Sequence, residues 1–135
     1  MPPIRPITVL IADDHTLVRQ GLGQLCEGMG GFTVVAEAEN GAQAVALART
    51  TRPGVILMDI VMPDVDGLSA LRLIQAKNPE TRIAMLSSVG AMASKAEEAF
   101  RLGAIQVLSK PIDQDVLGAL LAQECERIRP ADGSQ

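Results

Sequence analysis

The sequence lacks any run of about 18 consecutive apolar residues, the length that a membrane-spanning helix requires. Its first residues, Met1 to Pro6, also lack the long apolar core of a secretory signal peptide. Positive charge is not in excess, since the formal net charge is -4 at pH 7, whereas nucleic acids and anionic membranes attract basic patches. We therefore expect a cytoplasmic protein that has no membrane anchor and does not itself contact nucleic acid.

Cysteine is scarce, since Cys26 and Cys125 are the only two. They make no metal-binding cluster, and disulfides are rare in the cytoplasm, so we expect two reduced thiols. With 47% hydrophobic and 21% charged residues, the 135-residue chain has the composition of one globular domain. We place this domain at residues 1–129. We expect residues 130–135, which begin with proline and are polar, to form a flexible tail or the start of a linker.

Five short runs rich in apolar and β-branched residues recur about every 25 residues, with helical patterns between them. Several runs are apolar throughout, which is typical of a parallel sheet covered by helices on both faces. The sequence therefore predicts an α/β fold with a doubly wound, five-stranded parallel sheet. The predicted strands are Ile7 to Ala12, Thr33 to Glu37, Val55 to Met58, Ile83 to Leu86 and Gln106 to Leu108.

The helical patterns differ in strength. The fourth, Ala93 to Leu102, is rich in alanine and only weakly apolar, and we expect Phe100 to be its one large anchor. The first and fifth patterns have stronger apolar stripes, which predict the sides that face the core. These stripes comprise Leu17, Val18, Gly21, Leu22 and Leu25 in the first helix, and Val116, Leu117, Leu120 and Leu121 in the fifth.

Polar side chains follow four of the five predicted strands. Asp13 and Asp14 follow the first strand, Asp59 ends the third, Ser87 ends the fourth, and Lys110 follows the fifth. In open α/β sheets, ligands bind at the carboxyl ends of the strands. With the strand order 2-1-3-4-5, these four strands are neighbours, and we expect their polar groups to meet at one edge of the sheet.

Three carboxylates and one ammonium group give this predicted site a charge of about -2, and such a cluster is costly to bury unpaired. A divalent cation would neutralise it, and the all-oxygen ligands favour Mg²⁺ or Mn²⁺ over zinc. Asp59 is the natural nucleophile, because a carboxylate can form an acyl phosphate. Ser87 could donate a hydrogen bond to a phosphoryl oxygen, and Lys110 could pair with another.

Each feature also has a purely structural interpretation when it is taken alone. Asp13 or Asp14 could cap a helix, Ser87 could be a structural residue, Lys110 could be solvated, and residues 62–67 could be a turn before a helix. Their coincidence on strand ends is what favours the functional interpretation.

Several segments together resemble the receiver domains of response regulators in two-component signalling, over nearly the whole chain. The fold implied by this resemblance is flavodoxin-like. The matching segments are Val9 to His15 (VLIADDH), Leu57 to Pro63 (LMDIVMP), Asp66-Gly67, Leu86 to Ser88 (LSS), Gly103-Ala104 and Lys110-Pro111.

The resemblance implies a role for each site residue. Asp14 would bind the metal directly and Asp13 largely through water, while Asp59 and the backbone carbonyl of Val61 would complete the ligands. Asp59 would be the phosphoacceptor, and a histidine kinase or a histidine phosphotransfer protein would be the donor. Such a domain is a signalling receiver that catalyses only its own phosphorylation and dephosphorylation.

The resemblance further implies that Ser87 is the switch hydroxyl and that Lys110 binds the phosphoryl group. It also implies a cis peptide bond between Lys110 and Pro111, which would direct the ammonium group back toward Asp59.

Two departures from the family pattern matter. Receivers usually place an aromatic residue three positions before the lysine, where this chain has Val107, and the chain contains no Tyr or Trp. We therefore expect switching through the fourth helix and the surface it forms with the fifth strand and fifth helix, without a rotating aromatic ring; the alternative is a phosphate sink that barely switches. Val61 and Val89 stand where many receivers have polar groups, so we expect slow loss of the phosphoryl group.

Different segments of the chain indicate different recipients of the signal. The segment 14–22 (DHTLVRQGL) resembles regulators that have a helix-turn-helix domain, whereas segments 87–90 (SSVG) and 110–112 (KPI) resemble chemotaxis-type receivers. We expect an output domain outside this chain or a separate partner protein, and a phosphorylation-dependent homodimer is an alternative.

Three other classes of protein share some of these sequence features. A phosphatase of the haloacid dehalogenase type needs a second aspartate two residues after its nucleophile, where this chain has Val61. A flavodoxin-like cofactor protein would hold a phosphate in its first loop, where Asp13 and Asp14 would repel it. An interaction module that is never phosphorylated would need none of the acidic residues or the lysine.

Overall fold

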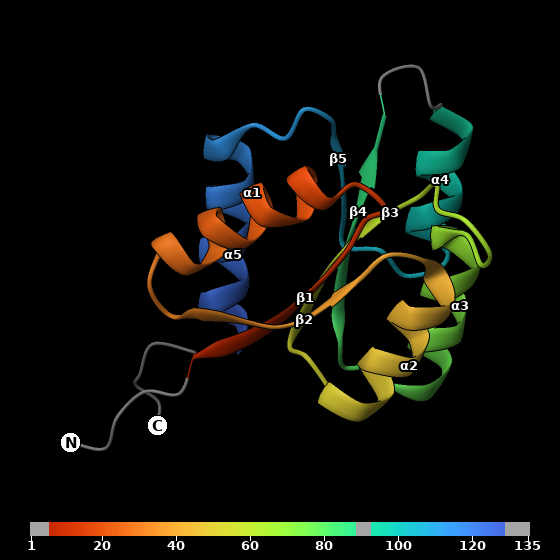
Figure 1. Cartoon of the computed structure of the whole chain (residues 1–135), viewed down its shortest axis with the longest axis horizontal. Coiled ribbons are helices and arrows are strands. Elements are labelled where there is room, and N and C mark those ends of the chain that lie inside the picture. The colour runs from red at the N-terminus through yellow and green to blue at the C-terminus, as the bar shows by residue number, and fades with distance from the viewer. Residues whose placement is uncertain (1–5, 89–92, 129–135) are drawn as a thin grey trace.

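The computed structural model describes residues 6–88 and 93–128, and within them strands and helices alternate along the chain (Figure 1). The five strands all pair in parallel, in the order β2-β1-β3-β4-β5, which confirms the predicted doubly wound sheet. The elements are β1 (Ile7–Ala12), α1 (Thr16–Gly28), β2 (Phe32–Ala38), α2 (Gly41–Thr51), β3 (Val55–Asp59), α3 (Gly67–Lys77), β4 (Arg82–Ser87), α4 (Ala93–Arg101), β5 (Gln106–Ser109) and α5 (Gln114–Ile128).

Helices cover both faces of the sheet, as predicted. On one face, α2, α3 and α4 pack against the sheet; on the other, α1 and α5 do so (Figure 1). The central strand β3 is buried along its whole length, which explains why its first four residues are all apolar. The edge strand β2 instead alternates between covered and exposed residues, because successive side chains point to opposite faces and the helices leave part of this strand uncovered.

The predicted strand bounds agree with the structure to within one residue at each end. The helices are more instructive, because four residues that were expected on core-facing sides are exposed. Phe100 is 48% exposed, and the adjacent Ala99 is the one buried residue of α4 within the part whose burial is described, residues 95–101. Successive helical residues point about 100° apart, so a weakly apolar helix gives little indication of which of two neighbours faces the core.

Leu17, Gly21 and Val116 are the other corrections: Leu17 is 81% and Val116 50% exposed, and Gly21 is exposed as well. Leu17 and Val116 lie in the first turn of their helices. The remaining stripes of α1 and α5 pack on the sheet through Leu22, Leu117 and Leu121. Both cysteines are free thiols, as expected, and burial raises the pKa of Cys26 to about 11. Among the helices described, none has the length and apolar character that crossing a bilayer requires.

Candidate functional site

Three charged side chains from separate strand ends meet at the carboxyl edge of the sheet. The ammonium nitrogen of Lys110 donates a hydrogen bond of 2.7 Å to Asp59 Oδ2, and it lies 2.6 Å from Asp13 Oδ2 as an ion pair. Asp13 is fully buried and Asp59 is nearly so. The predicted convergence of β1, β3 and β5 residues is therefore present.

The shared ammonium group offsets only part of the cost of burying two carboxylates. Burial raises the pKa of Asp59 above its usual value, although hydrogen bonds from Lys110 and from the Val61 N–H oppose this effect. Desolvation alone would lower the pKa of Lys110, yet its contacts with Asp13 and Asp59 raise it. The lysine is thus held in its charged form, while Asp59 is easier to protonate than an exposed aspartate.

Asp14 and His15 extend the acidic cluster toward solvent. The backbone N–H of His15 donates to Asp13 Oδ1 over 2.9 Å, and its ring Nδ1 lies 3.2 Å from the same oxygen and 3.1 Å from Asp14 Oδ1. One potential ligand atom each from Asp13, Asp14, His15 and Asp59 lies within 4.8 Å of the others. The predicted carboxylates are therefore close enough to share one metal ion. In the sequence, His15 is part of the VLIADDH motif, and its position directly after the acidic pair was the available signal for its part in the cluster.

Arg19 is a second residue whose part in the site the sequence analysis did not identify. Although it belongs to α1, it is 7% exposed, and its Nη1 donates 2.7 Å to the backbone carbonyl of Asp13. Its Nε donates 3.1 Å to Glu37 in β2. Arg19 therefore connects the acidic loop to a neighbouring strand. In the sequence, Arg19 directly follows Val18, which belongs to the predicted apolar stripe of this helix. A charged residue so close to the expected core side was the available signal that Arg19 is buried.

The loop after β3 holds Asp59 through its backbone. The N–H of Val61 donates 3.1 Å to Asp59 Oδ1, and the N–H of Gly67 donates 2.8 Å to the Ile60 carbonyl. A Cβ atom at Gly67 would lie 2.0 Å from the backbone oxygen of Asp59, so only glycine fits there. The Val61 side chain is exposed. Metal binding by its carbonyl stays a prediction, and Val89 lies outside the described residues.

Ser87 lies at the end of β4, beside the strand that bears Asp59. Its hydroxyl donates 3.3 Å to the Ser88 carbonyl, and its own backbone carbonyl accepts a 2.7 Å hydrogen bond from the Lys110 N–H. The Lys110–Pro111 peptide bond is cis, as predicted. Val107 pairs with Met85 of β4 and is half-buried against the cluster beneath α2, α3 and α4.

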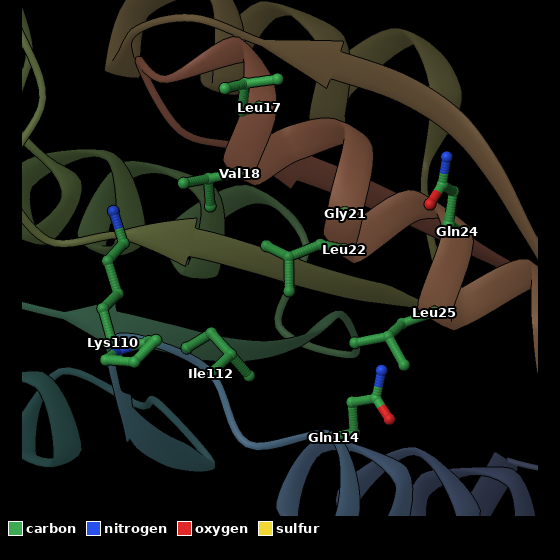
Figure 2. A pocket seen from close by; sticks show the side chains of 10 residues that line it. Leu17, Val18, Gly21, Leu22, Gln24, Leu25, Lys110, Ile112 and Gln114 are labelled. Atoms are coloured by element: carbon green, nitrogen blue, oxygen red, sulfur yellow. The ribbon is translucent and has the colours of Figure 1, made fainter.

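A mainly apolar pocket of about 470 Å³ adjoins the site, between α1 and the loop that leads into α5. Figure 2 shows Lys110 near one end of this pocket and Gln114 near the other, with Val18 and Leu22 between α1 and the loop. The exposed Leu17 is also part of its lining. The same lysine thus borders both the pocket and the acidic cluster.

Comparison with known proteins places this geometry in a family. The family model of the response regulator receiver domain matches residues 9–122. The chain is 39% identical over 107 residues to the chemotaxis protein CheY of Bacillus subtilis, and the match covers 79% of this chain and 88% of that protein. It is also 43% identical over 107 residues to a protein-glutamate methylesterase/protein-glutamine glutaminase of Anaeromyxobacter dehalogenans; the match covers 79% of this chain and spans only 31% of that longer relative.

Solved structures agree with this assignment. The receiver domain of AraT, a response regulator from Geobacillus stearothermophilus, superposes with a TM-score of 0.83 at 33% identity, covering 90% of this chain and 95% of that one. The response regulator domain of Thermotoga maritima CheB gives 0.77 at 33% identity, covering 96% and 100%. These matches decide against the haloacid dehalogenase and flavodoxin alternatives. The chain belongs to the family of response regulator receiver domains of two-component systems.

Proposed function

We propose that Asp59 accepts a phosphoryl group from a histidine kinase or a histidine phosphotransfer protein, with Mg²⁺ or Mn²⁺ as the cofactor. The observation that best supports this proposal is the position of Asp59, which is buried at the sheet edge between Lys110 and the acidic pair. In this proposal residues 1–129 form the receiver domain.

The residues present fit a hard divalent cation. Three carboxylates converge, and among residues 6–88 and 93–128 one ammonium group, that of Lys110, pairs with them. Asp14 and Asp59 would bind the ion directly, Asp13 would bind largely through water, and the Val61 carbonyl would add another oxygen. When bound, the ion would reduce the repulsion between the carboxylates and the phosphoryl oxygens and stabilise charge in the transition state.

The transfer itself needs little further chemistry from the chain. A carboxylate oxygen of Asp59 attacks phosphorus, a new O–P bond forms, and the P–N bond of the donor phosphohistidine breaks with its electron pair left on the imidazole. Lys110, which already contacts Asp59, would pair with one phosphoryl oxygen. The Ser87 hydroxyl would leave the Ser88 carbonyl and donate to another.

The apolar pocket beside Lys110 would receive a helix of the phosphodonor. A donor histidine must come within bonding distance of Asp59, so its protein has to cover the surface around Lys110. That surface includes Leu17, which is 81% exposed although it is a large apolar side chain. Burial of Leu17 by an apolar helix face would contribute to binding.

Phosphorylation with acetyl phosphate tests the assignment of Asp59. We expect metal-dependent addition of one phosphoryl group to the wild type, detected by intact mass, and none in Asp59→Asn. Asp64→Asn is a matched control, because Asp64 is an exposed residue of the same loop whose φ of 68° asparagine also adopts. Full phosphorylation of Asp59→Asn, or loss of phosphorylation in Asp64→Asn, would contradict the proposal.

The output surface in this proposal consists of α4, β5 and α5. Val107 has one stiff side-chain torsion, so the response would be a shift of α4, whose one buried residue in the described part is Ala99. The expected shift also includes the segment after Ser88, of which residues 89–92 lie outside the described residues. Amide exchange with and without a beryllofluoride mimic of the phosphoryl group tests this. Changes between residues 88 and 108 are expected; changes confined to the acidic loop would favour the phosphate sink.

The recipient of the signal is an output domain or a separate protein in this proposal, and a homodimer formed on phosphorylation is the alternative. Relatives of both kinds occur, since CheY of Bacillus subtilis matches over most of its length and the methylesterase relative is about three times as long as the match. Sedimentation with and without beryllofluoride would reveal a homodimer.

A further inference from the structure

His15 supplies a nitrogen donor to a cluster whose other donors are oxygens. Its Nδ1 lies 3.1–3.2 Å from one oxygen each of Asp13 and Asp14. Neighbouring ligands of an octahedral ion with bonds of about 2.1 Å are about 3 Å apart. The ring nitrogen therefore has the spacing of a ligand that is adjacent to both carboxylates.

Lys110 does not occupy this place. The ammonium group contacts Oδ2 of Asp13, whereas the His15 ring contacts Oδ1 of the same carboxylate, so the two groups lie at different oxygens. The His15 side chain is 67% exposed, and its Nε2 has no protein partner among the described residues. Without an ion, the contacts of Nδ1 with two carboxylate oxygens need a proton on Nδ1, because the carboxylates only accept. With an ion bound, the other tautomer would apply, in which the proton is on Nε2, in solvent, and the lone pair of Nδ1 faces the ion.

The backbone beneath His15 is also fixed. Arg19 donates to the Asp13 carbonyl at 2.7 Å, and the N–H of His15 donates to Asp13 Oδ1 at 2.9 Å. Two hydrogen bonds thus hold the loop on which the ring stands.

We propose that His15 binds the divalent cation through Nδ1 and shifts the preference of the site from Mg²⁺ toward Mn²⁺ and other transition ions. Imidazole is a common ligand of transition metals, whereas Mg²⁺ prefers oxygen ligands and retains its waters. This inference rests on the proposed function, because it requires that the acidic cluster bind the ion.

Electron spin-echo spectroscopy with Mn²⁺ alone tests the contact directly. His15 is the only histidine of the chain, so in protein without a histidine tag, labelling histidine with ¹⁵N marks this ring alone. We expect a nitrogen coupling that changes from ¹⁴N to ¹⁵N on labelling and disappears in His15→Ala and His15→Asn. Mn²⁺ that is bound by the wild type without such a coupling would overturn the inference.

Calorimetry with Mn²⁺ and Mg²⁺ gives a second measurement. His15→Ala removes the ligand, while His15→Asn places an amide oxygen near the position of Nδ1. Since loss of even an indirect metal partner costs about 10–100-fold in affinity, we expect the ratio of Mn²⁺ to Mg²⁺ affinity to fall at least about tenfold in both variants. An unchanged ratio overturns the inference but leaves metal-dependent labelling of Asp59 intact, whereas a wild type that binds neither ion would overturn the proposed function as well.

Discussion

The loops after β1 and β3 are held in place by contacts from several elements, whereas α4 packs on the sheet through few buried side chains. In the first region, Arg19 and Lys110 contact Asp13, and the backbone of Gly67 lies directly against Asp59. In α4, Ala99 is the one buried side chain among those described, and the large Phe100 is half-exposed. Both regions border the same edge of the sheet.

The difference separates two requirements of a receiver. Phosphoryl transfer needs reacting groups whose positions are fixed in advance, and the first region provides this. A conformational response needs an element that can move at low cost in free energy, and α4 has few apolar contacts to lose. Substitutions in the two regions should therefore differ in how much they lower the free energy of unfolding, and four substitutions test this difference.

Gly67→Ala should have the largest effect. The added Cβ would lie 2.0 Å from a backbone atom of Asp59, and no flexible side chain can relieve this overlap. We expect a loss of about 4 kcal/mol or more in the free energy of unfolding, measured with urea. Gly118→Ala in α5 is the matched control: its Cβ meets nothing within 4 Å, and it should stabilise the protein by up to about 1 kcal/mol. Equal effects would show that the first region is no more tightly packed than α5.

Lys110→Met should come next, because it removes the positive charge that pairs with two buried carboxylates. We expect a loss of about 3 kcal/mol at neutral pH, the lower end for a broken buried ion pair, because the ammonium is partly exposed. The pKa of Lys110 is raised above its ordinary 10.5, so its stabilising effect is fully present below pH 10.5 and is lost as the pH rises through the raised value. On the alkaline side, the stability difference between wild type and variant should therefore shrink only above pH 10.5; a difference that stays constant through that range would contradict this origin.

Arg19→Met should cost about 2 kcal/mol, because it removes the hydrogen bonds from a charged donor to the Asp13 carbonyl and to Glu37. It should also weaken Mg²⁺ binding, since the acidic loop loses its support. Arg72→Met, at an exposed position of α3, is the control and should change stability by less than about 0.5 kcal/mol. Normal Mg²⁺ affinity in Arg19→Met would show that the arginine supports the fold alone.

Phe100→Ala should have the smallest effect, about 1 kcal/mol, because the ring is 48% exposed. Truncating a phenylalanine that truly anchored the helix would cost about 3–5 kcal/mol. Thermal or urea unfolding distinguishes these values. A cost in the upper range would mean that α4 is firmly anchored, and the contrast with the loops after β1 and β3 would disappear.

The parts of this arrangement that follow from chain topology could be predicted from sequence. Fully apolar runs identify β1 and β3, and parallel strands bring Asp13, Asp59 and Lys110 to one edge whatever the side chains around them. The direction of single side chains could not be predicted in the same way. Phe100 and Ala99 differ by one helical position, and the pattern of α4 is too weak to choose between them.

The parts of Arg19 and His15 in the site depend on contacts that no sequence periodicity encodes. Arg19 is buried because the Asp13 carbonyl and Glu37 satisfy its charge, and these partners come from separate elements. The His15 ring could be turned toward solvent or toward the acidic pair, and only the folded structure shows its distance from both carboxylates.

The hydrogen bond between the Lys110 N–H and the Ser87 carbonyl has a consequence for how such sequences diverge. It joins main-chain atoms, so among ordinary substitutions at residue 110 only proline would remove the donor. The side chain at position 107 could therefore change many times in evolution while β4 and β5 stayed joined through the backbone of Ser87 and Lys110. Val107 can therefore stand where receivers usually have an aromatic residue without loss of the main-chain link between residues 87 and 110.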